Sequence, residues 1–288
     1  MYRRRLVLLA ASAFALLGCD FDGFGDSQRF KEDFLYTHRL NPGGRVSLEN
    51  FNGSVEIVGS DRDSIEIAGT KYAATEELLD AIRIEVDSTD AAIRIRTVRP
   101  YERRGNSGAR YRIRLPRKIE LERINTSNGA VSVQSIEGNA RLRTSNASVK
   151  AIGVKGDVDA QTSNGGIDLD DVEGGCILKT SNAGVRAERI RGGFEATSSN
   201  GGIQVELLNE PNRTVRLDTS NAGITLRMPA ASAARVRART SNGSVSSDFD
   251  VRRESGEKKK SSLDGEIGTG GPLLDLSTSN GNIRIGKL

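Results

Sequence analysis

The chain of 288 residues contains no tryptophan, a single histidine and two cysteines, and aromatic residues make up 5% of it. The histidine, His38, precedes the repeated part of the sequence, so no repeat contains an imidazole that could act as a general base. This counts against a hexapeptide-repeat acyltransferase, which normally needs such a base. Only Phe194 and Phe249 lie beyond residue 115, so the repeats also lack the exposed aromatic platforms that sugar-binding sites commonly use.

The chain also has little net positive charge outside its amino terminus. The formal net charge is +4, but three of the arginines are Arg3, Arg4 and Arg5 at the amino terminus. Residues 1–18 contain no acidic residue, so their removal lowers the net charge to +1. Nucleic-acid recognition needs a concentrated basic surface, and we therefore expect no nucleic-acid partner.

The one long apolar run, at residues 6–17, is 12 residues long and is too short to span a bilayer as a permanent helix. It follows the three arginines, as in a signal peptide, and the sequence LLGC ending at Cys19 resembles a bacterial lipobox. We expect residues 1–18 to be a lipoprotein signal peptide, with Cys19 as the lipidation site and residues 19–29 as a lipidated tether. The alternative is an ordinary secretory signal followed by an incidental cysteine. The lipid would anchor the chain to a membrane of the bacterial cell envelope, but it does not indicate which one.

The second cysteine, Cys176, is left without a disulfide partner if Cys19 carries lipid. It occupies the repeat position that Ala140, Val158 and Phe194 occupy in other repeats. This position is apolar, so we predict a buried, inert free thiol.

A short motif organises the rest of the chain: a threonine or serine, a polar residue, an asparagine, and then glycine or alanine. The first four intervals between its asparagines are 18 residues, the next two are 21 and the last is 38. Such a repeat is one supersecondary unit that buries its apolar face only by stacking on its neighbours. The motif predicts a parallel β-solenoid of about eight coils of 18–21 residues, with a structural ladder of Asn128, Asn146, Asn164, Asn182, Asn200, Asn221, Asn242 and Asn280.

Each coil alternates apolar and polar residues on both sides of the asparagine, which is typical of two half-buried strands. We expect Thr144, Asn146 and Val149 to stack on Thr162, Asn164 and Ile167. The asparagine itself is open to two interpretations: an inward-pointing amide ladder, or a left-handed backbone at the turn. A glycine ten residues after each of the first four asparagines indicates a second corner with unusual dihedral angles.

The segment before the repeats differs in composition. Residues 30–115 hold most of the aromatic residues and several alternating strand patterns, and one pattern is a degenerate repeat around Asn52. We expect this segment to be an amino-terminal β-sheet cap with one short helix at residues 75–81, and residues 116–288 to be the solenoid. The charged stretch at 252–271 is predicted to be a solvated insertion.

Three stretches together resemble a known family: NPGGRVSLENFNGSVEIVG, YRIRLPRKIELERINTSNGAV and the serial TSNG or TSNA turns. The chain is similar, over about residues 40–288, to the bacterial putative-adhesin β-strand repeat family, a domain of unknown function often found on lipoproteins. The resemblance implies an all-β solenoid on the outer side of a membrane. It supplies no catalytic motif.

The residues favour a non-enzymatic, adhesin-like envelope protein that binds or scaffolds cell-wall or envelope components. We expect no catalytic residues, no cofactor and no metal site, because the best acidic cluster, Asp168, Asp170 and Asp171, follows an alternation that places it on an outer strand face. Two alternatives stay open: a β-helical polysaccharide- or cell-wall-processing enzyme, and a glycan-binding module. The sequence does not indicate an oligomeric state.

Overall fold

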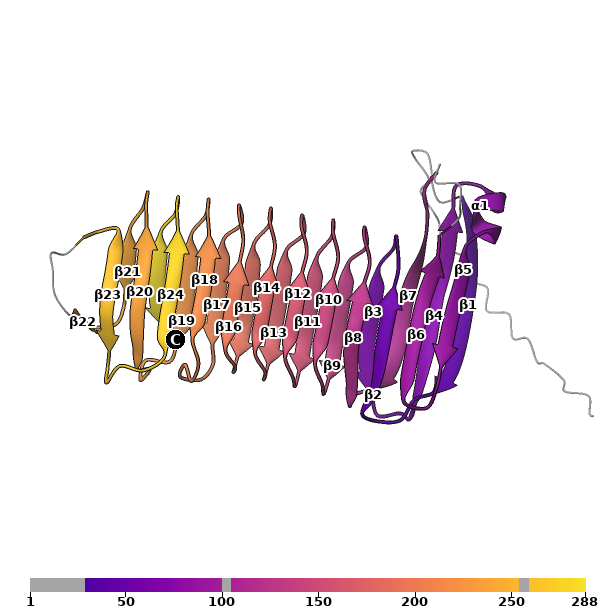
Figure 1. Cartoon of the computed structure of the whole chain (residues 1–288), viewed down its shortest axis with the longest axis horizontal. Helices are drawn as coiled ribbons and strands as arrows, with labels where there is room; N and C mark the ends of the chain where they lie inside the picture. Colours follow the sequence, from indigo (N-terminus) through magenta and orange to yellow (C-terminus); the bar gives the residue numbers. More distant parts are fainter. Residues whose placement is uncertain (1–28, 100–104, 254–258) are drawn as a thin grey trace, which may run out of the picture.

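A computed structural model describes residues 29–99, 105–253 and 259–288 of the chain. Its strands form two sheets, of 12 and 13 strands, that run side by side along a rod (Figure 1). One continuous cluster of buried apolar side chains fills the rod, and a second, small cluster lies around the short helix at residues 76–80. The prediction of an all-β solenoid is confirmed.

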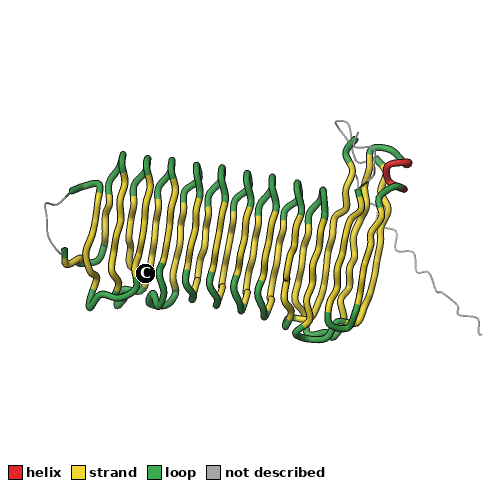
Figure 2. The backbone as a smooth tube through the Cα atoms, in the orientation of Figure 1, coloured by secondary structure: helices red, strands yellow, loops and turns green. Residues whose placement is uncertain are grey.

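Each coil gives one strand to each sheet, and turns line both long edges of the rod (Figure 2). Neighbouring coils pair in parallel, and Val149 pairs with Ile167 as predicted. The eight coils that carry the motif are β8 (Ile119–Asn125) with β9 (Val131–Ile136), β10 (Ala140–Arg143) with β11 (Val149–Val154), β12 (Val158–Gln161) with β13 (Ile167–Val172), β14 (Cys176–Lys179) with β15 (Val185–Ile190), β16 (Phe194–Thr197) with β17 (Ile203–Leu207), β18 (Val215–Thr219) with β19 (Ile224–Met228), β20 (Ala234–Thr240) with β21 (Val245–Ser247), and β24 (Leu273–Thr278) with β25 (Ile283–Lys287).

The core keeps a nearly constant volume by alternating leucine with alanine. In the β10/β11 coil, Leu142 on one sheet accompanies Ala151 on the other, and in the next coil Ala160 accompanies Leu169. All four side chains are buried. Because protein interiors are close-packed, this exchange lets coils of equal cross-section stack without voids.

The order of coils along the rod departs from their order in the sequence at both ends. The coil of β2 (Gly44–Glu49) and β3 (Val55–Ser60) lies between β8/β9 and the coil of β6 (Ala92–Val98) and β7 (Ser107–Pro116). At the other end, β24/β25 lies between β18/β19 and β20/β21, although it is last in the sequence (Figure 1). The parallel stack thus extends into the segment expected to be only a cap, and the boundary at residue 115 does not divide the structure.

The amino-terminal end is closed by antiparallel strands. In one sheet β1 (Phe30–Arg39) pairs with β4 (Ser64–Ala73) and β4 pairs with β7, and in the other β5 (Arg83–Ser88) pairs with β6. Phe34 packs edge-on against Tyr111 at a centroid distance of 5.3 Å, so aromatic side chains fill this end as predicted. The predicted helix is α1 (Glu76–Asp80), whose N-cap residue Thr75 accepts a hydrogen bond from the Leu78 N–H.

The carboxy-terminal end corrects one expectation. The stretch at 252–271 was predicted to be a solvated insertion, but β23 (Ser262–Ile267) forms within it and pairs antiparallel with β20. Leu263 and Ile267 are buried, because the alternation in SLDGEI directs them into the core. The short β22 (Val251–Arg252) adds one further antiparallel strand to this sheet.

The second corner also differs from its prediction. Gly138, Gly156, Gly174 and Gly192 do not have positive φ angles. They are glycines because a Cβ atom at each would lie within 2.4 Å of main-chain atoms of the preceding coil. The left-handed position comes three residues earlier, at Ser135, Gly153, Asp171 and Arg189, with φ between 54° and 63°.

This difference generates a test on two adjacent glycines. A Cβ at Gly174 would lie 2.3 Å from the Gly156 carbonyl, whereas one at Gly175 would have its nearest neighbour at 3.4 Å. We expect Gly174→Ala to lower the free energy of unfolding by about 1–3 kcal/mol, because the coils must move apart. The control, Gly175→Ala, should stay within about 0.5 kcal/mol of the wild type in urea unfolding. Equal losses in the two variants would contradict the close-approach explanation.

Candidate functional site

The predicted asparagine ladder forms, but on the solvent side of the turn. The Asn146 amide donates to Asn128 Oδ1 at 2.6 Å, and each further amide donates in the same way to the preceding coil. All eight asparagines are exposed, and none has a positive φ angle. Both interpretations made from the sequence, an inward amide and a left-handed corner, are therefore wrong. The order along the rod is Asn128, Asn146, Asn164, Asn182, Asn200, Asn221, Asn280 and Asn242.

An inward-pointing ladder of hydrogen bonds is made instead by the threonine or serine that lies two positions before each asparagine. Each hydroxyl is buried and donates, at 2.8–3.1 Å, to the carbonyl that follows the asparagine of the preceding coil, or to the Gly53 carbonyl in the first case. These hydroxyls belong to Thr126, Thr144, Thr162, Thr180, Ser198, Thr219, Thr240 and Thr278. A buried carbonyl that loses its donor costs free energy, so this row binds each coil to the next.

Thr162 tests the hydroxyl row. Its Oγ1 donates to the Ala147 carbonyl at 2.9 Å and accepts from the Gly165 N–H at 3.2 Å. Thr162→Val keeps the shape but removes both bonds, and we expect it to lower the free energy of unfolding by about 1–3 kcal/mol. Thr162→Ser keeps the hydroxyl, as Ser198 does, and should lose clearly less. Thermal and urea unfolding of both variants measure the difference, and a valine variant as stable as the serine variant would contradict this role.

The acidic cluster lies on the outer face, as predicted. Asp168 is exposed, Asp170 forms an ion pair with Arg189, and Asp171 forms one with Arg191 at 2.6 Å. Within the described parts of the chain, no group of three or more His, Cys, Asp or Glu side chains is arranged to hold a metal ion. The cluster therefore consists of surface ion pairs between neighbouring coils.

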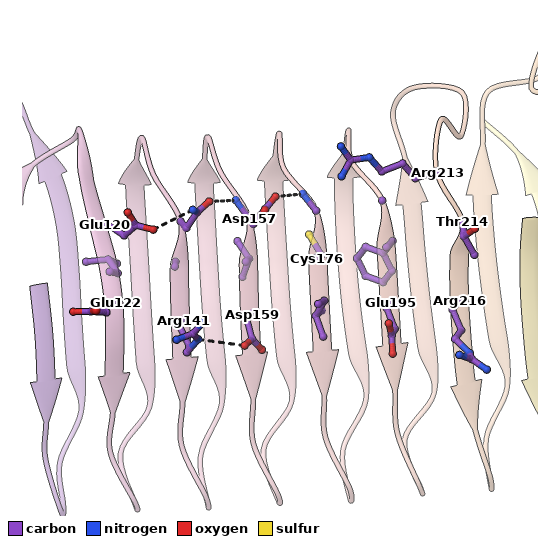
Figure 3. A pocket seen from close by; sticks show the side chains of 18 of the residues that line it. Glu120, Glu122, Arg141, Asp157, Asp159, Cys176, Glu195, Arg213, Thr214 and Arg216 are labelled. Carbon is purple, nitrogen blue, oxygen red and sulfur yellow. Dashed lines mark hydrogen bonds and ion pairs between the residues drawn. The ribbon is translucent and has the colours of Figure 1, made fainter. Parts of the chain in front are cut away.

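A groove of about 920 Å³ crosses β8, β10, β12, β14, β16 and β18, near the ends where these strands begin. Figure 3 shows charged side chains on the outer face of successive strands, with Cys176 close to the corner. Ile177, at the middle of the groove, is 46% exposed. The groove is therefore open, is lined by a mixture of charges and contains one exposed apolar side chain.

A row of side-chain caps runs along the upper edge of the groove in Figure 3 and then stops. Asn139 Oδ1 accepts from the Asp157 N–H at 2.8 Å, and Asp157 Oδ1 accepts from the Gly175 N–H at 2.7 Å. The next residue in the row is Gly193. Gly175, which holds the equivalent position in the coil before it, has no side chain that could accept a hydrogen bond from the Gly193 N–H. Among the described residues, the Gly193 N–H has no acceptor. The four residues follow successive asparagines by 11 positions, so the sequence itself displays this spacing.

Charges below this row are partly paired. Asp159 forms ion pairs with Arg143 at 2.5 Å and with Arg141 at 3.5 Å. Glu195 and Arg216 are direct cross-strand neighbours in the next part of the groove. Both signs thus face one open channel, and this arrangement suits the binding of a polar ligand that extends along the coils.

The groove's potential nucleophile is poorly suited to chemistry. Cys176 is buried, and this burial raises the pKa of its thiol to about 12, with a further contribution from the charge of Asp157. The thiolate, not the thiol, is the nucleophile. The prediction of a buried free thiol is confirmed.

The raised pKa predicts how stability depends on pH. The unfolded thiol ionises near its ordinary pKa, whereas the folded thiol stays protonated to about pH 12. Its contribution to stability is complete below pH 8.5 and is lost progressively between about pH 8.5 and 12. We therefore expect the wild type to lose more stability than Cys176→Ala on going from pH 8 to pH 10, as measured by urea unfolding. Identical losses would show that the thiol ionises equally in both states.

The other candidate residues lie away from the groove. His38 is in β1, where it pairs with Ile65 in the amino-terminal cap. Cys19 lies outside the described residues, as do the signal peptide and most of the tether. In the described ranges, no helix has the length and apolarity needed to cross a membrane.

The fold and the repeated turns define a class of two-sheeted parallel β-solenoids built on a TSN motif. The chain belongs to the Toastrack DUF4097 family, whose model matches residues 44–286, and the function of this domain is unknown. No curated protein matches the chain.

Several solved structures resemble it in fold. A putative adhesin from Bacteroides fragilis is 12% identical and has a TM-score of 0.46, with 89% of this chain and 97% of that chain covered. A putative adhesin from Parabacteroides merdae is 10% identical with a TM-score of 0.38, covering 89% and 96%. A putative lipid binding protein from Parabacteroides distasonis is 13% identical with a TM-score of 0.38, covering 90% and 96%.

Proposed function

We propose that this protein is a lipid-tethered, non-enzymatic rod of the bacterial cell envelope that binds or scaffolds an envelope component along its outer face. The tether is inferred from the arginine-rich start and the LLGC sequence ending at Cys19. The binding role is inferred from the rod itself.

The observation that carries the binding role is the groove across the second sheet. It extends over six consecutive coils and presents charged rows at the regular spacing of strands, about 4.8 Å. Its described lining contains no histidine, and the thiol beside it is protonated at neutral pH. Such a surface is suited to hold an extended polymer, whose contacts spread over several coils, and it lacks a nucleophile with an adjacent base.

Lipidation of Cys19 is the first test. We expect a palmitate analogue to label the wild type in bacterial cells and the protein to fractionate with membranes, because two or more acyl chains give stable anchoring. Cys19→Ser should lose the label, whereas Cys176→Ser should keep both the label and the membrane fraction. Equal labelling of the wild type and Cys19→Ser would exclude this tether.

Binding is tested with a chain of residues 20–288, which lacks the signal peptide and the lipid. It is incubated with purified sacculi and with whole-envelope extract, and the bound fraction is measured by sedimentation. Retention on either one supports the scaffold role, and retention on neither excludes it. Turnover of peptidoglycan, polysaccharide or acyl-ester substrates that survives repurification would instead support the enzyme alternative.

A further inference from the structure

The break in the capping row leaves a defined vacancy in the groove. In the two preceding coils, a side-chain oxygen of Asn139 or Asp157 accepts a hydrogen bond from a backbone N–H of the next coil. At Gly175 this side chain is absent, although the backbone register continues unchanged from Val158 through Cys176 to Phe194. The Gly193 N–H therefore faces the place where an oxygen stands in the other coils.

We propose that this vacancy is a binding site for the carboxylate of a ligand, which takes the position of the side chain missing at residue 175. The inference rests on the binding role proposed above and gives it a place and a ligand class. The first hydrogen-bond donor of the proposed site is the Gly193 N–H. In the preceding coil the equivalent N–H, that of Gly175, donates to the carboxylate of Asp157, so a carboxylate is an acceptor that this position already uses.

The second donor is Arg213. Its aliphatic stem packs on Gly193, where an added Cβ would lie 3.2 Å from Arg213 Cβ and 3.3 Å from its Cδ. In Figure 3 the side chain extends from the loop before β18 toward β16, above the groove. Arg213 makes no ion pair with the residues that the structure describes, so its guanidinium is available for a carboxylate, which it matches in geometry.

The surroundings restrict the ligand further. Ile177 follows Gly175 by two residues and is 46% exposed, so an apolar substituent next to the carboxylate would cover it. Asp157 lies beside the vacancy, with its Oδ1 3.4 Å from the position of a Cβ at Gly175, and Glu195 lines the same groove. Both repel negative charge, so the site holds a single carboxylate and depends on Arg213 to offset the repulsion. Arg216, the cross-strand neighbour of Glu195, offsets part of this repulsion. We therefore infer a monocarboxylate with a neighbouring aliphatic group, such as the carboxy terminus of a peptide or a short fatty acid.

The experiment follows the Gly193 amide by NMR in the full chain, labelled with [15N]glycine and purified in detergent. The Gly193 resonance is assigned by its loss in Gly193→Ala. N-acetylleucine represents a peptide terminus, octanoate a fatty acid, acetate the bare carboxylate, and inorganic phosphate a general anion. We expect a saturable shift with N-acetylleucine or octanoate, whichever source the site accepts, and weaker binding of acetate because it cannot cover Ile177.

Two variants and a control make the test specific. Gly175→Asn supplies the missing oxygen, as Asn139 does in its own coil, and the structure has room for the added Cβ. The Gly193 amide resonance of this variant should be shifted even without ligand, and it should not shift further when ligand is added. Arg213→Gln should bind about tenfold more weakly, the loss of one charge-assisted hydrogen bond. Arg235→Gln, an exposed arginine on β20 outside the groove, should bind as the wild type does.

Three results would overturn the inference. They are the absence of any saturable shift, an unchanged response in Gly175→Asn, and a response to phosphate as strong as that to the tighter-binding of N-acetylleucine and octanoate. If sacculi still retain the protein in any of these cases, the scaffold role stands and only the carboxylate site is excluded.

Discussion

Every part of this rod depends on one constraint: each residue lies beside its counterpart in the next coil, about one strand spacing away. Buried hydroxyls can therefore bind each coil to the preceding one, and exposed amides can form a continuous row. The same constraint excludes a Cβ where two corners meet too closely. It also shapes the outer rows, where equivalent charges are stacked on each other. Asp170 and Glu188 are like-charged neighbours of this kind, and arginines at 189 and 186 form ion pairs with them. In another row, Lys150, Asp168 and Arg186 are consecutive neighbours and their signs alternate.

The constraint has a cost at the ends, where a stack exposes unpaired strand edges and apolar surface. Antiparallel strands cover both sheets at the amino-terminal end, with β1 and β4 in one sheet and β5 in the other. At the other end β22 and β23 cover one sheet, and β21 is the outermost strand of the other. At both ends a coil is also inserted out of sequence order, so that the β2/β3 and β24/β25 coils each have a coil on both sides. The carboxy-terminal strand β25 is thus paired along both edges and is protected from fraying, which is otherwise concentrated at chain termini.

The repeat could be predicted because stacking forces equivalent positions to keep the same character. Val149 and Ile167 are interchangeable in volume and polarity, and their 18-residue spacing predicts their pairing. The insertion of β24/β25 could not be predicted, because the 38-residue interval before Asn280 has the same pattern whichever coil it joins. The direction of the asparagines was also misjudged. A threonine or serine and an asparagine recur at every turn, and periodicity alone does not distinguish the buried hydroxyl from the exposed amide.

The vacancy in the groove lies at the point where this stacking is incomplete. A ladder in which each coil caps the next is complete only if every coil supplies an acceptor, and Gly175 supplies none. A repeat protein can therefore create a binding site by omitting a side chain, since the neighbouring coils keep the donor in position. The change from an acceptor side chain to glycine is visible in the sequence 11 residues after successive asparagines, at Asn139, Asp157, Gly175 and Gly193. The sequence pattern becomes interpretable only once the structure shows that the first two side chains accept hydrogen bonds from the coil that follows, because glycine at a corner otherwise indicates only backbone geometry.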